Sequence, residues 1–105
     1  MRIVMSEEKK VLIIIPAYNE EENIGRVVRQ MIDRAPQYDY LVVNDGSSDS
    51  TIDICRRENF SYLDLPINMG IGGAVQAGYV YAEKKGYDIA VQMDGDGQHD
   101  IAYLD

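Results

Sequence analysis

The chain has 105 residues, 46% of them hydrophobic, so it is long enough for one domain with a packed core and too apolar for a disordered segment. Its 18 acidic residues outnumber its 10 basic residues, and the net charge of -8 excludes the basic face that nucleic-acid binding requires. The one cysteine, Cys55, excludes an internal disulfide and a four-cysteine zinc site, and it predicts a reducing, cytoplasmic compartment.

The first ten residues are polar and lack periodicity, so we expect residues 1–10 to be a flexible leader. The apolar run that follows, Val11 to Ile15, predicts a buried strand. This run is shorter than the roughly 7–15 apolar residues of an export signal. No segment approaches the roughly 18 apolar residues of a membrane span. Any membrane contact is therefore expected to be peripheral.

A helix is expected after this strand, which Pro16 should end. Asn19 is a suitable N-cap, and Glu22 stands three positions later, as in a capping box. Residues 20–22 are all glutamates, which the helix dipole favours in the first turn. The apolar residues then recur at helical spacing on one face: Ile24, Val27, Val28, Met31 and Ile32.

The middle of the chain repeats the alternation of strand and helix. Tyr40 to Val43 predicts a second strand, which runs into the turn residues Asn44-Asp45-Gly46. Asp49 or Ser50 is expected to cap a short helix that carries Ile52 and Cys55. A third strand is expected over Phe60 to Leu65.

The last part of the chain begins with a glycine-rich turn, Gly70 to Gly73, and a helix is expected after it. The helix should place Ala74, Ala77, Gly78 and Tyr81 along one side, and Gly86 fits its C-terminal cap. Asp88 to Met93 predicts a fourth strand, which leads directly into Asp94-Gly95-Asp96-Gly97.

Strands that alternate with helices predict an α/β fold with a mostly parallel sheet and right-handed crossovers. In such sheets, ligands bind beyond the carboxyl ends of the strands. Polar clusters follow the first, second and fourth expected strands. We therefore expect these clusters to meet at one edge of the sheet and to form the functional site.

The pair Asp94 and Asp96 is the main candidate for metal binding. Two carboxylates two positions apart after a buried strand are able to share one divalent cation, and Gly95 allows a tight turn between them. Oxygen ligands favour Mg²⁺ or Mn²⁺, and such an ion would neutralise a diphosphate leaving group. Alone, however, Asp-Gly-Asp is also what a solvated acidic turn contains.

Other polar residues at the same edge are candidates for substrate binding. Tyr18 is suited to lie against a nucleobase and Glu20 to bind ribose, although a helix start partly explains the glutamate. Asp45 is suited to accept hydrogen bonds from a base or ribose, and a turn explains it equally well. His99 is either a third metal or phosphate contact or a polar surface residue. The glycine run matches neither the dinucleotide-binding nor the Walker pattern.

Four stretches, in order, resemble inverting glycosyltransferases of family 2, which have the GT-A fold. They are Val11-Leu12-Ile13-Ile14-Ile15-Pro16-Ala17-Tyr18-Asn19-Glu20, Val42-Val43-Asn44-Asp45-Gly46-Ser47-Ser48-Asp49-Ser50-Thr51, Asn68-Met69-Gly70 and Gln92-Met93-Asp94-Gly95-Asp96-Gly97-Gln98-His99-Asp100. The chain is most similar to the branch that includes dolichol-phosphate mannose synthase, which transfers sugars to polyprenyl phosphates.

The resemblance implies a UDP- or GDP-sugar donor, inversion at the anomeric carbon, and an acceptor such as a polyprenyl phosphate. The residues implied to line the nucleotide pocket are Pro16, Ala17, Tyr18 and Glu20. Asp45 would contact the base, and Gly70 and Gly73 would lie near the nucleotide. Asp94 would lie near the ribose and the sugar, and Asp94 and Asp96 would hold Mg²⁺ or Mn²⁺.

The family's catalytic domain continues well past this metal motif, so residues 11–105 are expected to be its nucleotide-sugar-binding half. Such a partial sheet would expose an edge and apolar surface, which predicts self-association. Two other functions stay open. One is a non-catalytic nucleotide-binding module. The other is a phosphohydrolase of the haloacid dehalogenase type with Asp94 as nucleophile, although that motif prefers threonine where this chain has Gln98.

Overall fold

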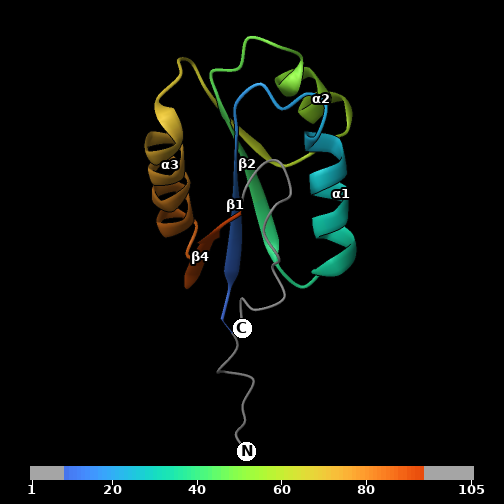
Figure 1. Cartoon of the computed structure of the whole chain (residues 1–105). Helices are drawn as coiled ribbons and strands as arrows, with labels where there is room; N and C mark the ends of the chain where they lie inside the picture. The colour runs from blue at the N-terminus through green and yellow to red at the C-terminus, as the bar shows by residue number, and fades with distance from the viewer. Residues whose placement is uncertain (1–8, 94–105) are drawn as a thin grey trace, which may run out of the picture.

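The computed structural model describes residues 9–93 (Figure 1). Strands and helices alternate along the chain, as the sequence predicts. Their bounds are β1 Val11–Ala17, α1 Ile24–Arg34, β2 Asp39–Asp45, α2 Thr51–Arg57, β3 Tyr62–Leu65, α3 Gly70–Lys84 and β4 Ile89–Gln92.

The four strands form one sheet in the order β3-β2-β1-β4, and each neighbouring pair is parallel. The carboxyl ends of all four strands therefore lie at the same edge of the sheet, which we call the carboxyl edge. Helices α1 and α2 cover one face of the sheet, and α3 covers the other (Figure 1). This arrangement confirms the predicted α/β fold with a mostly parallel sheet.

The core has two layers, one on each side of β1, all of whose residues are buried. On one side, Ile13 and Ile15 pack with the large aliphatic residues of α1. On the other side, Leu12 and Ile14 pack against small residues of α3, which therefore lies close to the sheet. A Cβ atom added at Gly78 would lie 2.7 Å from Cγ2 of Ile14, so only glycine allows this approach.

Two strands are longer than predicted. β1 does not end at Pro16 but continues to Ala17, and Pro16 pairs with Val43 of β2. On the other side of β1, the last pair with β4 is Ile14 with Gln92, so Pro16 stands beyond that ladder. β2 likewise includes Asn44 and Asp45, both buried, where a turn is predicted.

The predicted start of the first helix is wrong. Asn19 has a φ of 55°, which no helix N-cap adopts, and α1 begins only at Ile24, with Asn23 in the N-cap position. The carbonyl of Glu20 accepts hydrogen bonds from the N–H groups of Asn23 and Ile24, at 3.0 and 2.8 Å. The three glutamates thus belong to a turn before the helix. Ile32, predicted on the buried face, is exposed.

The predicted glycine turn is also wrong, because Gly70 to Gly73 form the first turn of α3. Gly86, directly after the C-cap residue of that helix, has a φ of 81°, which confirms its predicted capping role. The third and fourth strands are shorter than predicted and begin at Tyr62 and Ile89. Within residues 9–93, none of the helices has the length and apolar character needed to cross a membrane.

Candidate functional site at the carboxyl edge

Three loops meet at the carboxyl edge of the sheet: residues 18–23 after β1, 46–50 after β2 and 66–69 after β3. They lie together at the upper end of the molecule in Figure 1. Each loop is short, and each follows directly from a buried or half-buried strand. The positions of their side chains are therefore set by the sheet, and we refer to the three loops together as the rim.

Asn19 connects the first two loops of the rim. Its left-handed backbone points the side chain across to the neighbouring loop, where Oδ1 accepts the N–H groups of Ser48 and Asp49 at 2.8 and 3.3 Å. In return, the N–H of Asn19 donates to Oγ of Ser47 at 2.9 Å. The side chain that the sequence assigns to a helix cap thus holds together two loops that lie about thirty residues apart.

A second set of contacts repeats this exchange one residue further along each loop. The N–H of Glu20 donates to Oγ1 of Thr51 at 2.9 Å, and the N–H of Ser50 donates to Oε1 of Glu21 at 2.9 Å. Asp49 accepts hydrogen bonds from the N–H of Thr51 at 2.9 Å and from the N–H of Glu21 at 3.2 Å. The N-cap residue of α2 is Ser50, whose side chain makes no capping hydrogen bond, and Asp49 stands one residue before it, bonds the first N–H of the helix and also holds the first loop.

The pKa of Asp49 is lower than its ordinary value of 3.8. Partial burial raises it, but the hydrogen bonds from the hydroxyl and the N–H of Thr51 and from the N–H of Glu21 together outweigh that effect. The carboxylate is thus ionised at neutral pH and acts as a structural acceptor in the rim.

Asp45 connects the second loop to the third. Its carboxylate is buried, and Oδ1 accepts the N–H of Met69 at 2.6 Å. Its Oδ2 accepts Nδ2 of Asn68 at 3.2 Å, and the same amide also donates to the carbonyl of Asp45 at 3.1 Å. Gly46 has a φ of 67°, and a Cβ there would lie 2.4 Å from the backbone nitrogen of Asn68. The third loop therefore packs directly against the end of β2.

The other residues predicted to bind the donor differ in how far their side chains are exposed. Pro16 and Ala17 are buried within β1. Tyr18 follows at the rim and is 49% exposed, and Glu20 is half-buried, with Oε1 accepting Nδ2 of Asn23 at 3.2 Å. Of these four side chains, Tyr18 is the one most open to a ligand.

Gly70 and Gly73, also predicted to lie near the nucleotide, are in the first turn of α3, directly after the third loop. Gly70 has a φ of 80°, and no atom lies within 4 Å of the position a Cβ would take. The backbone at Gly70 is therefore open, whereas a Cβ at Gly73 would lie 2.7 Å from Cβ of Met69. The first N–H groups of a helix are natural donors to a phosphate. The structure thus brings these glycines to the same rim as Asp45 and Tyr18.

The predicted metal ligands, Asp94 and Asp96, lie outside the described residues, as does His99. The structure does describe the residue before them: the N–H of Met93 donates to the carbonyl of Ile14 at 2.8 Å, at the carboxyl edge. Between residues 9 and 93, no three His, Cys, Asp or Glu side chains are grouped to hold a metal ion. Among the predicted residues, the metal site therefore depends on the two aspartates that follow Met93.

Three asparagines at this edge have roles that the sequence analysis missed. Asn19 and Asn68 fix the loops, and Asn44, buried in β2, donates Nδ2 to Oδ1 of Asp64 at 2.8 Å. Oδ1 of Asn44 is buried without a hydrogen-bond partner. A usable signal was present, because Asn44 is near the end of β2 and the other two asparagines lie in the short loops within three residues of a strand end, where amides commonly bond the backbone.

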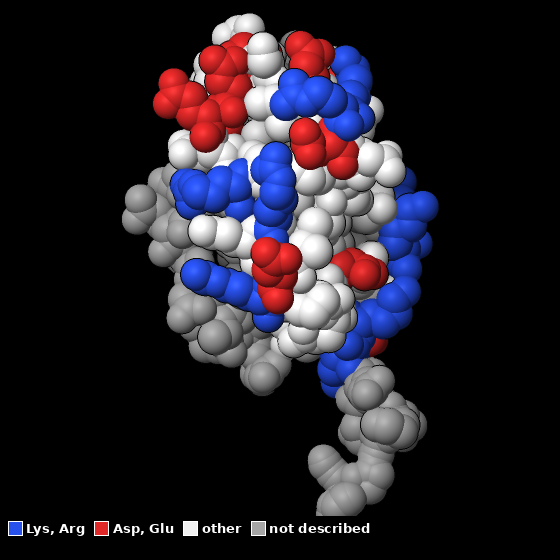
Figure 2. All heavy atoms as spheres, turned by 90° about the vertical axis from the view of Figure 1, so that its right-hand side faces the viewer, with Lys and Arg blue, Asp and Glu red and all other residues white. Residues whose placement is uncertain are grey.

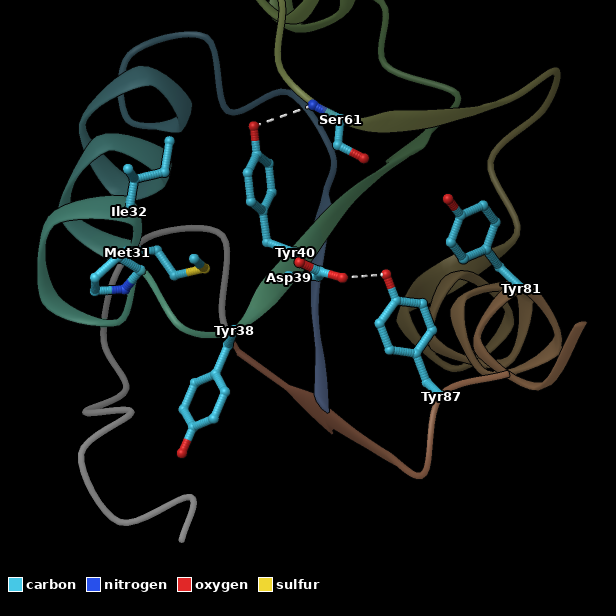
Figure 3. Close-up of a pocket in the computed structure, with 9 residues that line it drawn as sticks. Met31, Ile32, Tyr38, Asp39, Tyr40, Ser61, Tyr81 and Tyr87 are labelled. Atoms are coloured by element: carbon cyan, nitrogen blue, oxygen red, sulfur yellow. Dashed lines mark hydrogen bonds between the residues drawn. The ribbon is translucent and has the colours of Figure 1, made fainter. Parts of the chain in front are cut away.

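A separate hollow of about 310 Å³ lies at the opposite, amino edge of the sheet (Figure 3). It curves around the start of β2, where β3 has not yet begun, and tyrosines from several elements line it: Tyr38, Tyr40, Tyr81 and Tyr87. The hydroxyl of Tyr87 donates to Asp39 at 2.6 Å, and burial followed by this contact raises the pKa of Tyr87 to about 12. This hollow is at the wrong end of the strands to belong to the rim.

The single cysteine is not a nucleophile in this fold. Cys55 lies on the buried face of α2, and burial, followed by the nearby charge of Asp64, raises the pKa of the thiol to about 11. A thiol with that pKa is protonated at neutral pH. Among the described residues, the groups available to contact a ligand are therefore the oxygen and amide groups of the rim.

The sequence matches the model of the family described as glycosyl transferase family 2 over residues 12–104. It is 38% identical over 95 residues to an undecaprenyl-phosphate mannosyltransferase from Micrococcus luteus, a match that covers 86% of this chain and 39% of the relative. It is 34% identical over 97 residues to a polyprenol monophosphomannose synthase from Mycolicibacterium smegmatis, covering 87% of this chain and 37% of that protein. The chain thus spans well under half the length of these two relatives.

Solved structures agree on the fold. A mannosyltransferase from Pyrobaculum calidifontis, in complex with GDP-Man and Mn²⁺, superposes with a TM-score of 0.74 at 22% identity, over 87% of this chain and 28% of that one. Glucosyl-3-phosphoglycerate synthase from Mycobacterium tuberculosis, in complex with Mn²⁺, UDP and glucosyl-3-phosphoglycerate, superposes with a TM-score of 0.64 at 22% identity, over 83% of this chain and 33% of that one. The parallel sheet, the shared architecture and the match across residues 12–104 lead to one conclusion: the chain belongs to glycosyl transferase family 2.

Proposed function

We propose that this chain supplies the donor-binding part of an inverting glycosyltransferase. The donor is a UDP- or GDP-sugar bound with Mg²⁺ or Mn²⁺, and the acceptor is a polyprenyl phosphate or a related lipid or glycan. The observation that carries the proposal is the family match over residues 12–104, in a fold whose three hydrogen-bonded loops meet at the carboxyl edge.

The acceptor is inferred from the relatives, several of which are named for polyprenyl, undecaprenyl or dolichyl phosphates. The phosphate of such an acceptor is already an anion and is a competent nucleophile without a strong general base. The polar side chains of the described rim are carboxylates, amides, hydroxyls and the phenol of Tyr18, with no histidine among them. The match to this family also leaves the phosphohydrolase alternative without support.

Within the proposed site, Tyr18 provides an exposed ring for the nucleobase or ribose, and Glu20 provides a carboxylate beside it. Asp45 is proposed to contact the base. Its two oxygens each accept one hydrogen bond from the third loop, and a carboxylate oxygen is able to accept a second. Pro16 and Ala17 form the floor at the end of β1.

Gly70 and Gly73 place the open first turn of α3 next to the donor, with backbone N–H groups for its phosphates. Asp94 and Asp96 are proposed to hold the cation, and Asp94 also to lie near the ribose and the sugar. The ligand chemistry fits, since paired carboxylates suit Mg²⁺ and Mn²⁺. When bound, such an ion supplies positive charge that stabilises a nucleoside diphosphate as leaving group.

Calorimetric titration with UDP and with GDP, in the presence and absence of Mn²⁺, tests the proposal. We expect one of the two nucleotides to bind, and to bind at least about tenfold more tightly with Mn²⁺, which corresponds to about 1.4 kcal/mol. Asp96→Ala should remove this metal-dependent gain. Asp33→Ala, which removes an exposed carboxylate on α1, is the matched control and should leave binding unchanged.

The absence of binding by either nucleotide would contradict the proposal as a whole. A gain with Mn²⁺ that survives Asp96→Ala would contradict the assigned metal ligand. Transfer of sugar to a polyprenyl phosphate should then be measured with the sugar derivative of the nucleotide that binds. If the chain is part of a longer protein, that longer protein should be used.

A further inference from the structure

We infer that the outer surface of α3 and the loop before it rest on an anionic phospholipid bilayer. This inference rests on the proposed polyprenyl-phosphate acceptor, because it states how the protein meets an acceptor that is confined to a membrane. The surface consists of exposed apolar residues of the loop and helix and of two lysines at the helix end: Ile67, Met69, Ile71, Tyr79, Val80, Lys84 and Lys85.

The first part of this surface is the cluster Ile67, Met69 and Ile71. These side chains are 63%, 56% and 61% exposed, the largest values for large hydrophobic residues among those the structure describes. Their orientation is fixed, because Asn68 between them turns inward and bonds Asp45 through its side-chain amide. The loop is therefore held with three apolar side chains directed into solvent, at an energetic cost that a lipid partner would remove.

The second part is the outer face of α3 itself. No charged residue stands between Asp64 and Glu83, and the exposed positions of the helix include Tyr79 and Val80. A solvent-facing helix ordinarily carries charges on its outer side. Helix α1 does so, with exposed residues at Arg26, Arg29, Asp33 and Arg34.

The charge distribution favours an anionic bilayer over an uncharged one. Lys84 and Lys85 are exposed at the end of α3, and Nζ of Lys85 lies 5.7 Å from the ring centre of Tyr81. Apolar side chains followed by lysines and tyrosines are typical of segments that lie in the membrane interface. Each such lysine is attracted to an anionic surface, and salt screens that attraction. Glu83 opposes this pair, so the expected attraction is modest and sensitive to salt.

The opposite side of the molecule is chemically different. Figure 2 shows the side formed by α1 and α2, where acidic and basic side chains are interspersed over the surface. Most acidic residues of the described chain lie in or beside these two helices: Glu20, Glu21, Glu22, Asp33, Asp49, Asp53 and Glu58. The same two helices also carry five arginines, whereas residues 65–82 carry no charge, so an anionic surface would meet the α3 side without facing a cluster of acidic side chains.

The orientation has a functional consequence. α3 runs from the rim to the amino edge of the sheet (Figure 1), so a helix that lies along the bilayer brings the rim to the headgroup level. Met69, one of the exposed apolar residues, also donates its N–H to Asp45. The membrane contact and the proposed donor site therefore share one loop, which places the donor next to a phosphate at the lipid surface.

Co-sedimentation with vesicles tests the inference. The protein should bind vesicles of phosphatidylcholine and phosphatidylglycerol, and bind more weakly to phosphatidylcholine alone. The double variant Ile67→Gln/Ile71→Gln should weaken vesicle binding by about tenfold or more, since each change removes apolar area from the interface. Lys84→Gln/Lys85→Gln should weaken binding to the anionic vesicles only. Ile32→Gln, which changes an exposed isoleucine on α1, is the matched control and should have no effect.

The unfolding temperature of each variant confirms that it is folded, because all five positions are exposed. Failure of the protein to bind anionic vesicles, or equal binding by the Ile67/Ile71 variant, would overturn the inference. The inference would also be overturned if light scattering showed a dimer of the unchanged protein and a monomer of the Ile67/Ile71 variant, and the unchanged protein did not bind vesicles. Nucleotide binding without vesicle binding would refute this inference alone, and vesicle binding without nucleotide binding would refute the proposed function alone.

Discussion

Helices α1 and α3 cover opposite faces of the same sheet by different physical means. α1 presents large aliphatic side chains to the sheet, among them Val27, Val28 and Met31. α3 presents Ala74, Gly78 and Ala82, so its backbone approaches β1 closely. Large side chains thus fill the space between α1 and the sheet, whereas the backbone of α3 packs directly against the sheet.

The connections of the two layers differ as well. The α1 and α2 side is tied at the rim by side chains that bond backbone groups, with Asn19 and Asp49 as the principal acceptors. The α3 side is tied by Asp45, which is buried. Because α3 packs closely on β1, we expect its side to be the more sensitive to added volume. Because several side chains hold the α1 and α2 side at the rim, we expect that side to respond to lost hydrogen bonds and to pH.

The largest effect is expected from Gly78→Val. The new side chain would meet Ile14, whose Cγ2 already lies 2.7 Å from the position of a Cβ and whose branched side chain is fully buried. Overpacking of this kind costs about 1–3 kcal/mol. Urea denaturation should show the loss as a lower midpoint at unchanged slope.

Gly72→Ala is the control for that variant, because it also lies in α3 but has no atom within 4 Å of the added Cβ. It should raise the free energy of unfolding by up to about 1 kcal/mol, since alanine favours the helix. If Gly78→Val were no less stable than Gly72→Ala, close packing would not explain Gly78, and the contrast between the two layers would fail.

A smaller effect is expected from Asn19→Ala on the other side of the molecule. The change removes the acceptor for Ser48 and Asp49 and places alanine at a φ of 55°, for a total loss of about 1–2 kcal/mol. Asn19→Gly keeps the backbone conformation and loses only the hydrogen bonds, so it should be less destabilised by about 1 kcal/mol. Identical unfolding midpoints for the two variants would show that the left-handed backbone carries no strain.

The smallest effect is expected from titration of Asp49. Its pKa in the folded protein is below the ordinary value of 3.8, so its contribution to stability is present above that pH and is lost as the pH falls through the folded value. Unfolding midpoints measured at about pH 6 and about pH 3 should therefore differ less in Asp49→Asn than in the unchanged protein. An equal difference in both would show that other carboxylates account for the acid sensitivity.

The sequence predicted the order of the elements, because the first two strands contain apolar runs and the first helix has a periodic apolar face, with turn and cap residues between the elements. It did not predict where the first and third helices begin. Asn19 followed by Glu22 is a sound local signal for a helix start, but residues about thirty positions away offer Asn19 better partners. Gly70 to Gly73 read as a turn locally, yet Asp45 fixes the residues before them and the helix begins at once.

For the candidate site, the sequence predicted that Asp45 and Tyr18 reach one edge, because parallel strands end together. The sequence left open whether Asp45 has a structural role, and its contacts with Asn68 and Met69 show that it has one. Such contacts depend on how closely β2 and the third loop approach, which no spacing along the chain reveals. The roles of Asp94 and Asp96 stay predictions, because the structure describes the chain up to Met93.

Pro16 has a consequence for the neighbouring strand. In the parallel register of β1 and β4, the N–H of Met93 bonds the carbonyl of Ile14, so the next rung would need an N–H from residue 16 to the carbonyl of Met93. Proline has no N–H to donate, so this hydrogen bond between β1 and β4 cannot form. Pro16 of β1 thus limits how far β4 can pair with β1, and this limit falls directly before Asp94 in the sequence.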